Sequence, residues 1–413
     1  MIELFKKLKK VDEVLKELSQ YLKTHITTVK LNISEALGHY LAEDVHAKID
    51  VPYFNRSVVD GFAICSEDTF GASIHNPAIL KIVRMEKPEF YELKRGEAVE
   101  VFTGSPLPRN ADAVVMYEDV NIREDFIEVT RPVTPYSNIS KRGEDFRKGE
   151  LVLKKGIKLR PWDIAILASL GYRQVEVYKP KVALLCTGDE LIELYEVNDI
   201  LKLPYGKIIN STRYVIEGLL KEFGCEITYL GILPDDEEII ASTLRKVLPN
   251  HDLVVTIGGV SVGKRDLTFK AVLKLDPEYY CHGLAIRPGR PTSVAVINGK
   301  LIIMLSGFPV AALTGFEFLL RPILLKLMNA INELRPIVKG KLSRRINKPI
   351  NVKALVRVKV YREDDNYIIE PLALTGSGVL STLSESNGVI IIPEDIEGFD
   401  ESSLVEVILT RYQ

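Results

Sequence analysis

The residues best suited to chemistry follow three apolar segments of the chain, each at the point where the segment ends. The segments end in CTGDE, GILPDD and TIGGVSVGKRD. Glycines let backbone N–H groups approach an anion closely, and Asp and Glu are hard oxygen ligands for Mg²⁺ that can also organise water. We therefore expect an anion site with carboxylates around it. Its candidate residues are Thr187, Gly188, Asp189, Glu190, Asp235, Asp236, Gly258, Gly259, Ser261, Gly263 and Asp266.

The glycine-rich segment GGVSVGKRD fits neither of the common nucleotide-binding loops. Gly258 to Lys264 has the spacing of a P-loop, but Arg265 follows where Ser or Thr would bind Mg²⁺. The Rossmann pattern fails because Val260 occupies the position of its middle glycine. A tight strand-to-helix turn without a ligand would also use glycine here. The carboxylates at the neighbouring segment ends favour the alternative, a loop that binds phosphate through backbone N–H groups and not through Lys264.

Two further segments offer groups that bind anions. In AIRPGRP, Arg287, Pro288 and Arg290 stand around a Pro-Gly turn, and the guanidinium groups could bind a phosphate. A surface turn with two solvated arginines is the more common case. The segment LIIMLSGFPVAAL predicts a strand, a short turn and an apolar helix, whose first residues offer backbone donors.

Carboxylates also cluster outside this region. The segment VVDGFA places Asp60 before Gly61, and KRGEDFRKGE places Glu144 and Asp145 after a glycine. An Asp beside a Gly in a loop is most often a turn former. These carboxylates become functional candidates only if folding or dimerisation brings them to the anion site.

The elements that must position these residues change along the chain. Strands and helices alternate from about 180 to 330, which predicts βαβ units and a parallel, doubly wound sheet. Ligands of such sheets bind at the carboxyl ends of the strands, so the three segment ends should share one rim. Short strands over 78–130 predict a small β-rich unit, and those after Pro336 predict a compact β domain. Helices are expected over 2–22, over 33–43 and from Pro161 to just before Gly171.

Composition and charge exclude several classes of protein. The 413-residue chain is 46% hydrophobic and 27% charged, as in ordinary globular proteins and unlike disordered or fibrous ones. Its formal net charge of −2 provides no basic field for duplex nucleic acid. Four cysteines without a CxxC pair and six histidines without HxxxH or HExxH spacing give no zinc or redox motif. No apolar run approaches the roughly 20 residues of a membrane span, and the N-terminus does not resemble a signal peptide, so we expect a cytoplasmic protein.

Taken in chain order, eight segments resemble one family, the molybdopterin molybdenumtransferases, known as MoeA in bacteria and as the C-terminal part of gephyrin in animals. The segments are EALGHYLAEDV, VPYFNRSVVDGFA, VFTGSPLPRNADAVVMYED, RGEDFRKGE, LLCTGDEL, GKIINS, DLVVTIGGVSVGKRD and AIRPGRP. The resemblance implies an L-shaped, multidomain α/β plus β chain that dimerises. Its parts would be a mixed α/β linker domain I (24–48 and 140–177), a β-rich inserted domain II (49–139), a doubly wound α/β molybdopterin-binding domain III (1–23 and 178–330) and a C-terminal β-barrel-like domain IV (331–413).

The activity that the resemblance implies is the insertion of molybdate or tungstate into adenylylated molybdopterin, with release of AMP and with Mg²⁺ as cofactor. Catalytic roles would fall on Asp60, Thr103, Asp145, Glu190 and Asp266, of which Glu190 and Asp266 would bind Mg²⁺. Molybdopterin would be bound by Thr187, Gly188, Asp235 or Asp236, Gly258, Gly259, Ser261, Gly263, Pro288 and Arg290, with Arg287, Arg357 and Ser377 as weaker candidates. Expected partners are molybdopterin, the oxyanion, a second copy of the chain and the molybdopterin adenylyltransferase, but neither nucleic acid nor a membrane.

Two alternative functions share parts of this pattern. The molybdopterin adenylyltransferase resembles residues 178–330 but is normally a single domain, whereas more than half of this chain lies outside that region. A gephyrin-like scaffold would not need Asp60, Glu190 and Asp266. The chain also departs from many relatives at two positions. Phe308 stands where they have Asn, and Gly283 where they have a basic residue that His282 could replace.

Overall fold

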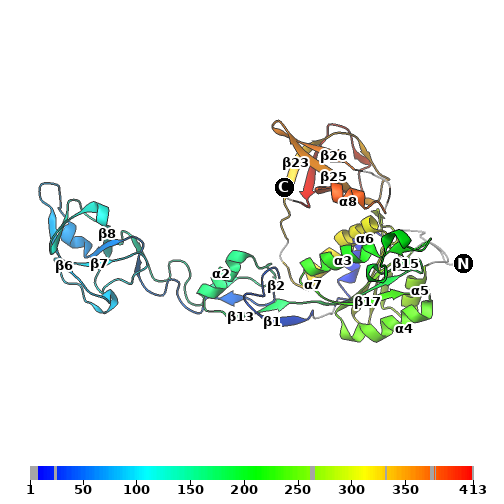
Figure 1. The fold of residues 1–413 in the computed structure, drawn as a ribbon, viewed down its shortest axis with the longest axis horizontal. Coiled ribbons are helices and arrows are strands. Elements are labelled where there is room, and N and C mark those ends of the chain that lie inside the picture. The colour runs from blue at the N-terminus through cyan, green and yellow to red at the C-terminus, as the bar shows by residue number, and fades with distance from the viewer. Residues whose placement is uncertain are drawn as a thin grey trace. The chain divides into compact units, whose positions relative to one another are not determined.

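The computed structural model describes residues 8–22, 26–260, 266–330, 333–372, 376 and 378–411. The chain forms two compact units, shown with all elements in Figure 1. The first unit comprises 1–43, 155–160 and 174–413, and the second comprises 44–154 and 161–173. The four domains expected from the sequence are a finer division than these two units, and their boundaries stay a prediction.

A six-stranded sheet forms the centre of the first unit. In spatial order its strands are β17 (Glu226–Leu233), β14 (Lys181–Thr187), β18 (Leu253–Ile257), β22 (Lys300–Leu305), β21 (Ser293–Ile297) and β19 (Tyr279–Cys281). The first four are parallel, which confirms the expected sheet. β21 runs antiparallel to β22, and β19 runs antiparallel to β21. The reversal occurs because Asn298 and Gly299 both take a positive φ and form a two-residue hairpin between β21 and β22.

Helices cover both faces of this sheet, as the doubly wound prediction requires. On β14, Val182, Leu184 and Cys186 enter one core, and Ala183 and Leu185 enter the other. Strands buried on both faces are apolar almost throughout, which explains the run VALLC. The first core is completed by α1 (Val11–Leu18), α3 (Ser211–Glu222), α6 (Pro309–Gly315), the π-helical segment Phe316–Leu320 and α7 (Arg321–Leu327). The second core is completed by α4 (Glu237–Val247) and α5 (Leu267–Leu273).

The C-terminal part of the first unit is a closed five-stranded barrel, which confirms the predicted barrel-like domain. Its strands, in order, are β25 (Lys353–Glu363), β26 (Asn366–Pro371), β23 (Ile337–Leu342), β29 (Leu404–Leu409) and β27 (Gly388–Ile392), and β27 pairs back onto β25. β20 (Ile286–Arg287) adds to β25 in parallel, so the AIRPGRP segment is joined to the barrel. The barrel also carries α8 (Ser381–Glu385) and the pair β24 (Ile346–Asn347) and β28 (Gly398–Phe399).

The second unit is built on a mixed six-stranded sheet, which confirms the β-rich prediction for 78–130. In order its strands are β8 (Ala113–Met116), β5 (Gly61–Ile64), β7 (Glu97–Val101), β6 (Ala78–Val83), β10 (Phe126–Val129) and β9 (Val120–Arg123). Two short pairs join β4 (Arg56–Ser57) to β11 (Ile139–Ser140) and β3 (Val45–His46) to β12 (Leu151–Leu153). The helix α2 (Pro161–Ser169) begins at the predicted proline, and Gly171 takes a φ of +77° just after it.

The prediction of a helix over 33–43 is wrong. A single turn follows β1 (Thr28–Asn32), and Gly38 then takes a φ of +80°. The next residues form β2 (Tyr40–Leu41) on β13 (Gln174–Tyr178), and the Leu41 N–H donates to the Ile157 carbonyl at 2.9 Å. Tertiary strand pairing therefore overrides the local helical pattern. The expected helix over 2–22 is shorter, since α1 spans Val11–Leu18; residues 1–7 lie outside the described residues.

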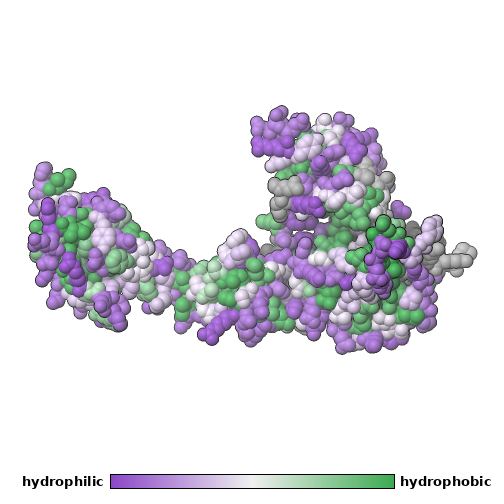
Figure 2. Space-filling model, viewed as in Figure 1, coloured by the Kyte–Doolittle hydropathy of each residue, from purple (hydrophilic) through white to green (hydrophobic). Residues whose placement is uncertain are grey.

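Figure 2 shows a mostly polar face. Apolar side chains gather in its α/β part, at the place where Figure 1 labels β15. β15 (Leu191–Ile192) pairs in parallel with β16 (Ile208–Ile209). The segment between them exposes Leu201 and Tyr205 almost completely. Among the described residues, no helix has the length and apolar character needed to cross a membrane.

Candidate functional site

The parallel strands bring the predicted segment ends to one rim of the first unit. Asp235 follows β17 and Asp189 follows β14. The Asp235 N–H donates to Asp189 Oδ1 at 3.2 Å. Gly258 follows β18, and Leu305 is the last residue of β22. The Gly258 N–H donates to the Leu305 carbonyl at 3.0 Å. Four strand ends therefore meet where the sequence placed the anion site.

Two buried threonines lie behind the glycines of this rim. Thr187 Oγ1 and Thr268 Oγ1 are 3.3 Å apart, and the Thr268 hydroxyl donates to the Gly258 carbonyl at 3.2 Å. A β-carbon on Gly259 would lie 2.2 Å from Thr268 Oγ1 and 2.6 Å from Thr187 Oγ1. Gly259 is therefore required by packing, whereas the sequence interpretation gave it to the bound anion. Thr268 was missed because a threonine in a helix has no distinctive sequence signal.

We expect Gly259→Ala to lower the free energy of unfolding by about 2–4 kcal/mol, since the new methyl group adds overpacking to the strain of a φ of +63°. Gly231→Ala is the matched control. It has a φ of +88° with nothing within 4 Å of the new β-carbon, so only backbone strain of about 1 kcal/mol applies. Denaturant unfolding of both variants measures the difference, and equal losses would contradict the packing argument.

Glu190 occupies space that a neighbouring glycine leaves open. A β-carbon on Gly188 would lie 2.9 Å from both carboxylate oxygens of Glu190. The carboxylate is exposed, and the Ile208 N–H fixes the backbone carbonyl of the same residue at 2.9 Å. Lys207 Nζ donates to the Asp189 carbonyl. The segment that carries Glu190 is therefore anchored to β16 while its carboxylate faces solvent.

A buried ionic network lies just beyond Glu190, and the sequence interpretation did not find it. The Glu193 side chain is 3% exposed and pairs with Arg213 Nη1 at 3.1 Å. Its other oxygen accepts hydrogen bonds from Asn210 Nδ2 at 3.2 Å and from the Tyr229 hydroxyl. The network ties the segment after β14 to α3 and β17, so it holds Glu190 in place.

Asp266 differs from the other predicted carboxylates because it is buried. The residue is 5% exposed, Oδ2 lies 2.8 Å from His282 Nε2, and Oδ1 has no hydrogen-bond partner among the described residues. No group of three His, Cys, Asp or Glu side chains in the described ranges is arranged for a metal ion. Mg²⁺ does not need such a cage, because it keeps several waters and uses one or two carboxylates with substrate phosphates. A buried oxygen without a partner fits this role.

The two aspartates after β17 have different surroundings. Asp236 caps α4, where its Oδ1 accepts the N–H groups of Glu238 and Ile239, both at 2.9 Å. An N-cap of this kind stabilises a helix by satisfying its free donors. Asp235 is exposed on the rim. The sequence left the choice between the two open, and the cap assigns Asp236 a structural role.

The arginine-rich turn lies against α6 and is joined to the barrel. The Leu284 N–H donates to the Arg290 carbonyl at 2.9 Å, and a β-carbon on Gly289 would lie 2.8 Å from the Ala311 carbonyl. Arg287 and Pro288 are half-buried, and Arg290 is exposed. On the barrel, Arg357 is 4% exposed and its Nε donates to Thr382 Oγ1 at 3.0 Å; burial lowers the pKa of its guanidinium.

Several predicted residues fall outside the described residues. These are Ser261 and Gly263, with Lys264 and Arg265 of the same loop, and Ser377 of the barrel. At the two departures from relatives, Phe308 is 57% exposed and its ring lies about 3 Å from the position of a β-carbon on Gly378. His282 contacts Asp266, so the sequence expectation that it could replace a basic group near a phosphate gains no support.

Asp60 and Thr103 of the second unit are in direct contact. Asp60 precedes β5 and Thr103 follows β7, and these neighbouring strands pair Gly61 with Val101. Asp60 Oδ1 accepts the Thr103 N–H at 2.7 Å and the Thr103 hydroxyl at 2.9 Å. These two hydrogen bonds, the backbone one first, lower the pKa of the Asp60 carboxyl. The structure thus brings two sequence-predicted residues together.

We expect Thr103→Val to raise the pKa of Asp60 part of the way toward its ordinary value. The substitution removes the hydroxyl donor and keeps the backbone N–H, and each donor favours the charged carboxylate. Because the pKa rises, Asp60 should become protonated at a higher pH than in the wild type. A carboxyl-detected NMR titration measures this shift, with Thr134→Val as control. An unchanged titration of Asp60 would mean that the hydroxyl has no effect.

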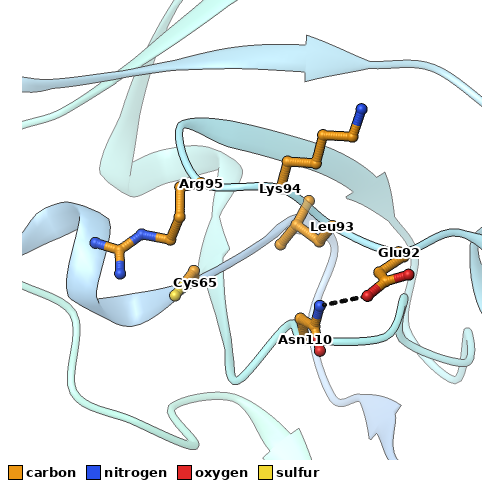
Figure 3. Close-up of a pocket in the computed structure, with 6 residues that line it drawn as sticks. All are labelled: Cys65, Glu92, Leu93, Lys94, Arg95 and Asn110. Atoms are coloured by element: carbon orange, nitrogen blue, oxygen red, sulfur yellow. Dashed lines mark hydrogen bonds between the residues drawn. The ribbon is translucent and has the colours of Figure 1, made fainter.

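Asp145 lines a shallow cavity of about 420 Å³ in the second unit, with Lys141, Arg142 and Arg147 around it. The loop is held in place because Arg142 Nε donates to Asp50 Oδ2 at 2.7 Å and the Asp145 N–H donates to the Val51 carbonyl at 3.0 Å. A second cavity, of about 500 Å³, contains none of the predicted residues (Figure 3). It is lined by Cys65, Glu92, Leu93, Lys94, Arg95 and Asn110.

Three models of known protein families match successive parts of the chain. Residues 9–171 match the MoeA N-terminal region (domain I and II), residues 183–326 match a probable molybdopterin binding domain, and residues 339–410 match the MoeA C-terminal region (domain IV). The three matches follow one another in the order expected from the sequence.

Whole-length relatives agree with these matches. A Methanocaldococcus jannaschii protein named for molybdopterin biosynthesis is 40% identical over 401 residues, 96% of each chain. The molybdopterin molybdenumtransferase of Staphylococcus epidermidis is 35% identical over 95% of this chain and 94% of its own. The crystal structure of a molybdopterin biosynthesis MoeA protein from Pyrococcus horikoshii, 35% identical, matches with a TM-score of 0.82 over 98% of this chain and all of the other.

Proposed function

The chain belongs to the MoeA family of molybdopterin molybdenumtransferases and is a transferase of molybdenum cofactor biosynthesis, and we propose that its reaction inserts molybdate or tungstate into adenylylated molybdopterin with release of AMP. The observation that carries this proposal is the rim of the α/β sheet. It combines an exposed carboxylate and two close-packed glycines with a buried carboxylate, one oxygen of which has no hydrogen-bond partner in the described part of the chain.

Each group has a distinct task in the proposed reaction. The backbone N–H groups from Gly259 to Gly263 bind the phosphates of the substrate beside Thr187 and Gly188, since the Gly258 N–H already donates to the Leu305 carbonyl. Arg287, Pro288 and Arg290, with Ser377 of the barrel, surround the rest of molybdopterin. Asp266 and Glu190 orient water toward the phosphoanhydride that is cleaved to release AMP.

Glu190 and Asp266 are the residues that would hold Mg²⁺ in this reaction. When bound, Mg²⁺ neutralises phosphate charge that develops as AMP leaves. Asp266 Oδ1, which has no partner within the ranges that the structure describes, supports this assignment, because a buried carboxylate oxygen favours a cation as its partner.

Asp60, Thr103 and Asp145 belong to the second unit, and we propose that they complete the cleft from the other subunit of a two-fold dimer. The hydrogen bonds from Thr103 favour the charged form of Asp60, which suits a group that orients water or a cation. The molybdopterin adenylyltransferase, which would supply the substrate, is a further proposed partner in the cytoplasm.

The decisive experiment measures AMP release from adenylylated molybdopterin by the purified chain. We expect release only after molybdate or tungstate is added, and we expect it to stop when Mg²⁺ is chelated and to return when Mg²⁺ is restored. Loading with equal molybdate and tungstate then reports the preferred oxyanion. Adenylylation of molybdopterin from ATP would instead identify an adenylyltransferase, and the lack of any turnover would favour a scaffold.

Asp235 and Asp236 should respond differently to substitution. We expect Asp235→Asn to lower AMP release by about 10-fold or more, as for a group near the reacting phosphate. Asp236→Asn keeps the helix cap and should keep the activity, whereas Asp236→Ala should cost about 1 kcal/mol of stability with turnover retained. Kinetics and denaturant unfolding of the three variants test this division. A larger activity loss at Asp236→Asn than at Asp235→Asn would reverse the assignment.

A further inference from the structure

His282 holds one oxygen of the Asp266 carboxylate. Its Nε2 lies 2.8 Å from Oδ2, and the two side chains are 15% and 7% exposed. His282 follows the edge strand β19, whereas Asp266 directly precedes α5, so the contact joins two segments that are separate in the sequence. A hydrogen bond so well shielded from water holds its two groups in a defined geometry.

The imidazole plane is fixed by the same helix that follows Asp266. Phe269 lies in α5, and its ring stacks on the imidazole with centroids 3.9 Å apart and planes inclined by 21°. Tyr280 meets the Phe269 ring at 5.8 Å. The ring of His282 therefore cannot turn away from Asp266 without losing this stack.

A serine lies at the other nitrogen of the imidazole. The Ser293 hydroxyl donates to the Pro291 carbonyl at 2.8 Å, and its oxygen accepts the Gly283 N–H at 3.0 Å. His282 Nδ1 lies 3.2 Å from the same oxygen. This arrangement orients Nε2 toward Asp266.

The second carboxylate oxygen of Asp266 remains available. Oδ1 is buried and has no hydrogen-bond partner among the described residues, while Oδ2 is held by His282. Buried polar atoms nearly always have a partner in folded proteins, so this atom marks a place for a bound group. A carboxylate held through one oxygen can present the other in a fixed direction.

We propose that His282 is a positioning residue, which orients Asp266 so that Oδ1 binds the divalent cation. Carboxylates that bind metals are themselves commonly held by hydrogen bonds from neighbouring groups, and loss of such a group typically costs 10- to 100-fold in affinity or activity. The proposal rests on the proposed function. It adds the residue that fixes the geometry of this carboxylate, and it assigns the imidazole no proton transfer in the reaction.

Two substitutions separate the hydrogen bond from the packing. His282→Phe keeps a ring on Phe269 and removes the donor to Oδ2. His282→Gln loses the ring, but its amide nitrogen can reach the former position of Nε2. His251→Phe is the matched control, because His251 contacts the Val247 carbonyl at the end of α4 and no predicted site residue. Isothermal titration with Mg²⁺ is measured on the full chain, alongside kcat and KM for AMP release.

For His282→Phe we expect kcat to fall by about 10- to 100-fold with little change in KM, and the Mg²⁺ dissociation constant to rise by about 10-fold. His282→Gln should stay within about threefold of the wild type on both readouts, since it restores the donor. Equal losses in the two variants, or wild-type Mg²⁺ binding in His282→Phe, would overturn the proposal.

If His282→Phe does not fold, His282→Asn replaces it, because the shorter amide cannot reach Oδ2. Asn should then lose at least about 10-fold relative to Gln, and equal behaviour would overturn the proposal. The wild-type chain distinguishes this failure from that of the proposed function. Absence of AMP release by the wild type refutes the function, whereas Mg²⁺ titration of the variants still decides the role of His282.

Discussion

Asp266→Asn is expected to lower the rate of AMP release by roughly 10²-fold or more while the chain stays folded. The substitution removes the charge of the buried carboxylate but keeps its shape, and the amide oxygen can still accept the hydrogen bond from His282 Nε2. Binding of a cation at the former Oδ1 should therefore weaken without loss of the surrounding packing. Single-turnover kinetics with saturating Mg²⁺ measure the effect.

Asp276→Asn is the matched control for this variant. It makes the same chemical change at an exposed position just beyond α5, where a φ of +57° suits Asn as well as Asp. We expect its rate to stay within about twofold of the wild type. Undiminished turnover in Asp266→Asn would remove this residue from the proposed site.

Mixing two inactive variants should restore activity if the cleft joins two subunits. Asp60→Ala removes a carboxylate of the second unit, and Glu190→Ala removes one of the α/β rim. In a two-fold dimer with shared clefts, a mixed dimer has one cleft with both substitutions and one with neither. Equal mixing yields about half mixed dimers, so about a quarter of the wild-type activity should return.

Two measurements make this result interpretable. Differently tagged subunits show by co-purification whether the variants exchange, and each variant assayed alone shows the background. Restoration by exchange would support the dimer and its composite cleft together. Full exchange with no restored activity would place Asp60 and Glu190 of one cleft in the same chain.

The sequence by itself determined the parallel sheet and which residues lie at the carboxyl ends of its strands. Strands buried on both faces must be apolar throughout, and the run VALLC of β14 satisfies that requirement locally. Parallel strands then place their carboxyl ends on one rim, so CTGDE, GILPDD and the glycines after β18 could be assigned together. The five strands of the barrel were also predictable, because each has its own pattern of apolar residues.

Tertiary structure decided which of these residues are available for chemistry. Whether Asp236 caps a helix depends on where α4 begins, and whether Gly259 meets an anion or Thr268 depends on the packing behind the rim. The helix expected over 33–43 gave way to strand pairing with β13. The contacts of Asp266 with His282 and of Asp60 with Thr103 join residues 16 and 43 positions apart. Sequence periodicity reports only local burial, whereas a hydrogen bond between distant residues requires the folded arrangement of both segments.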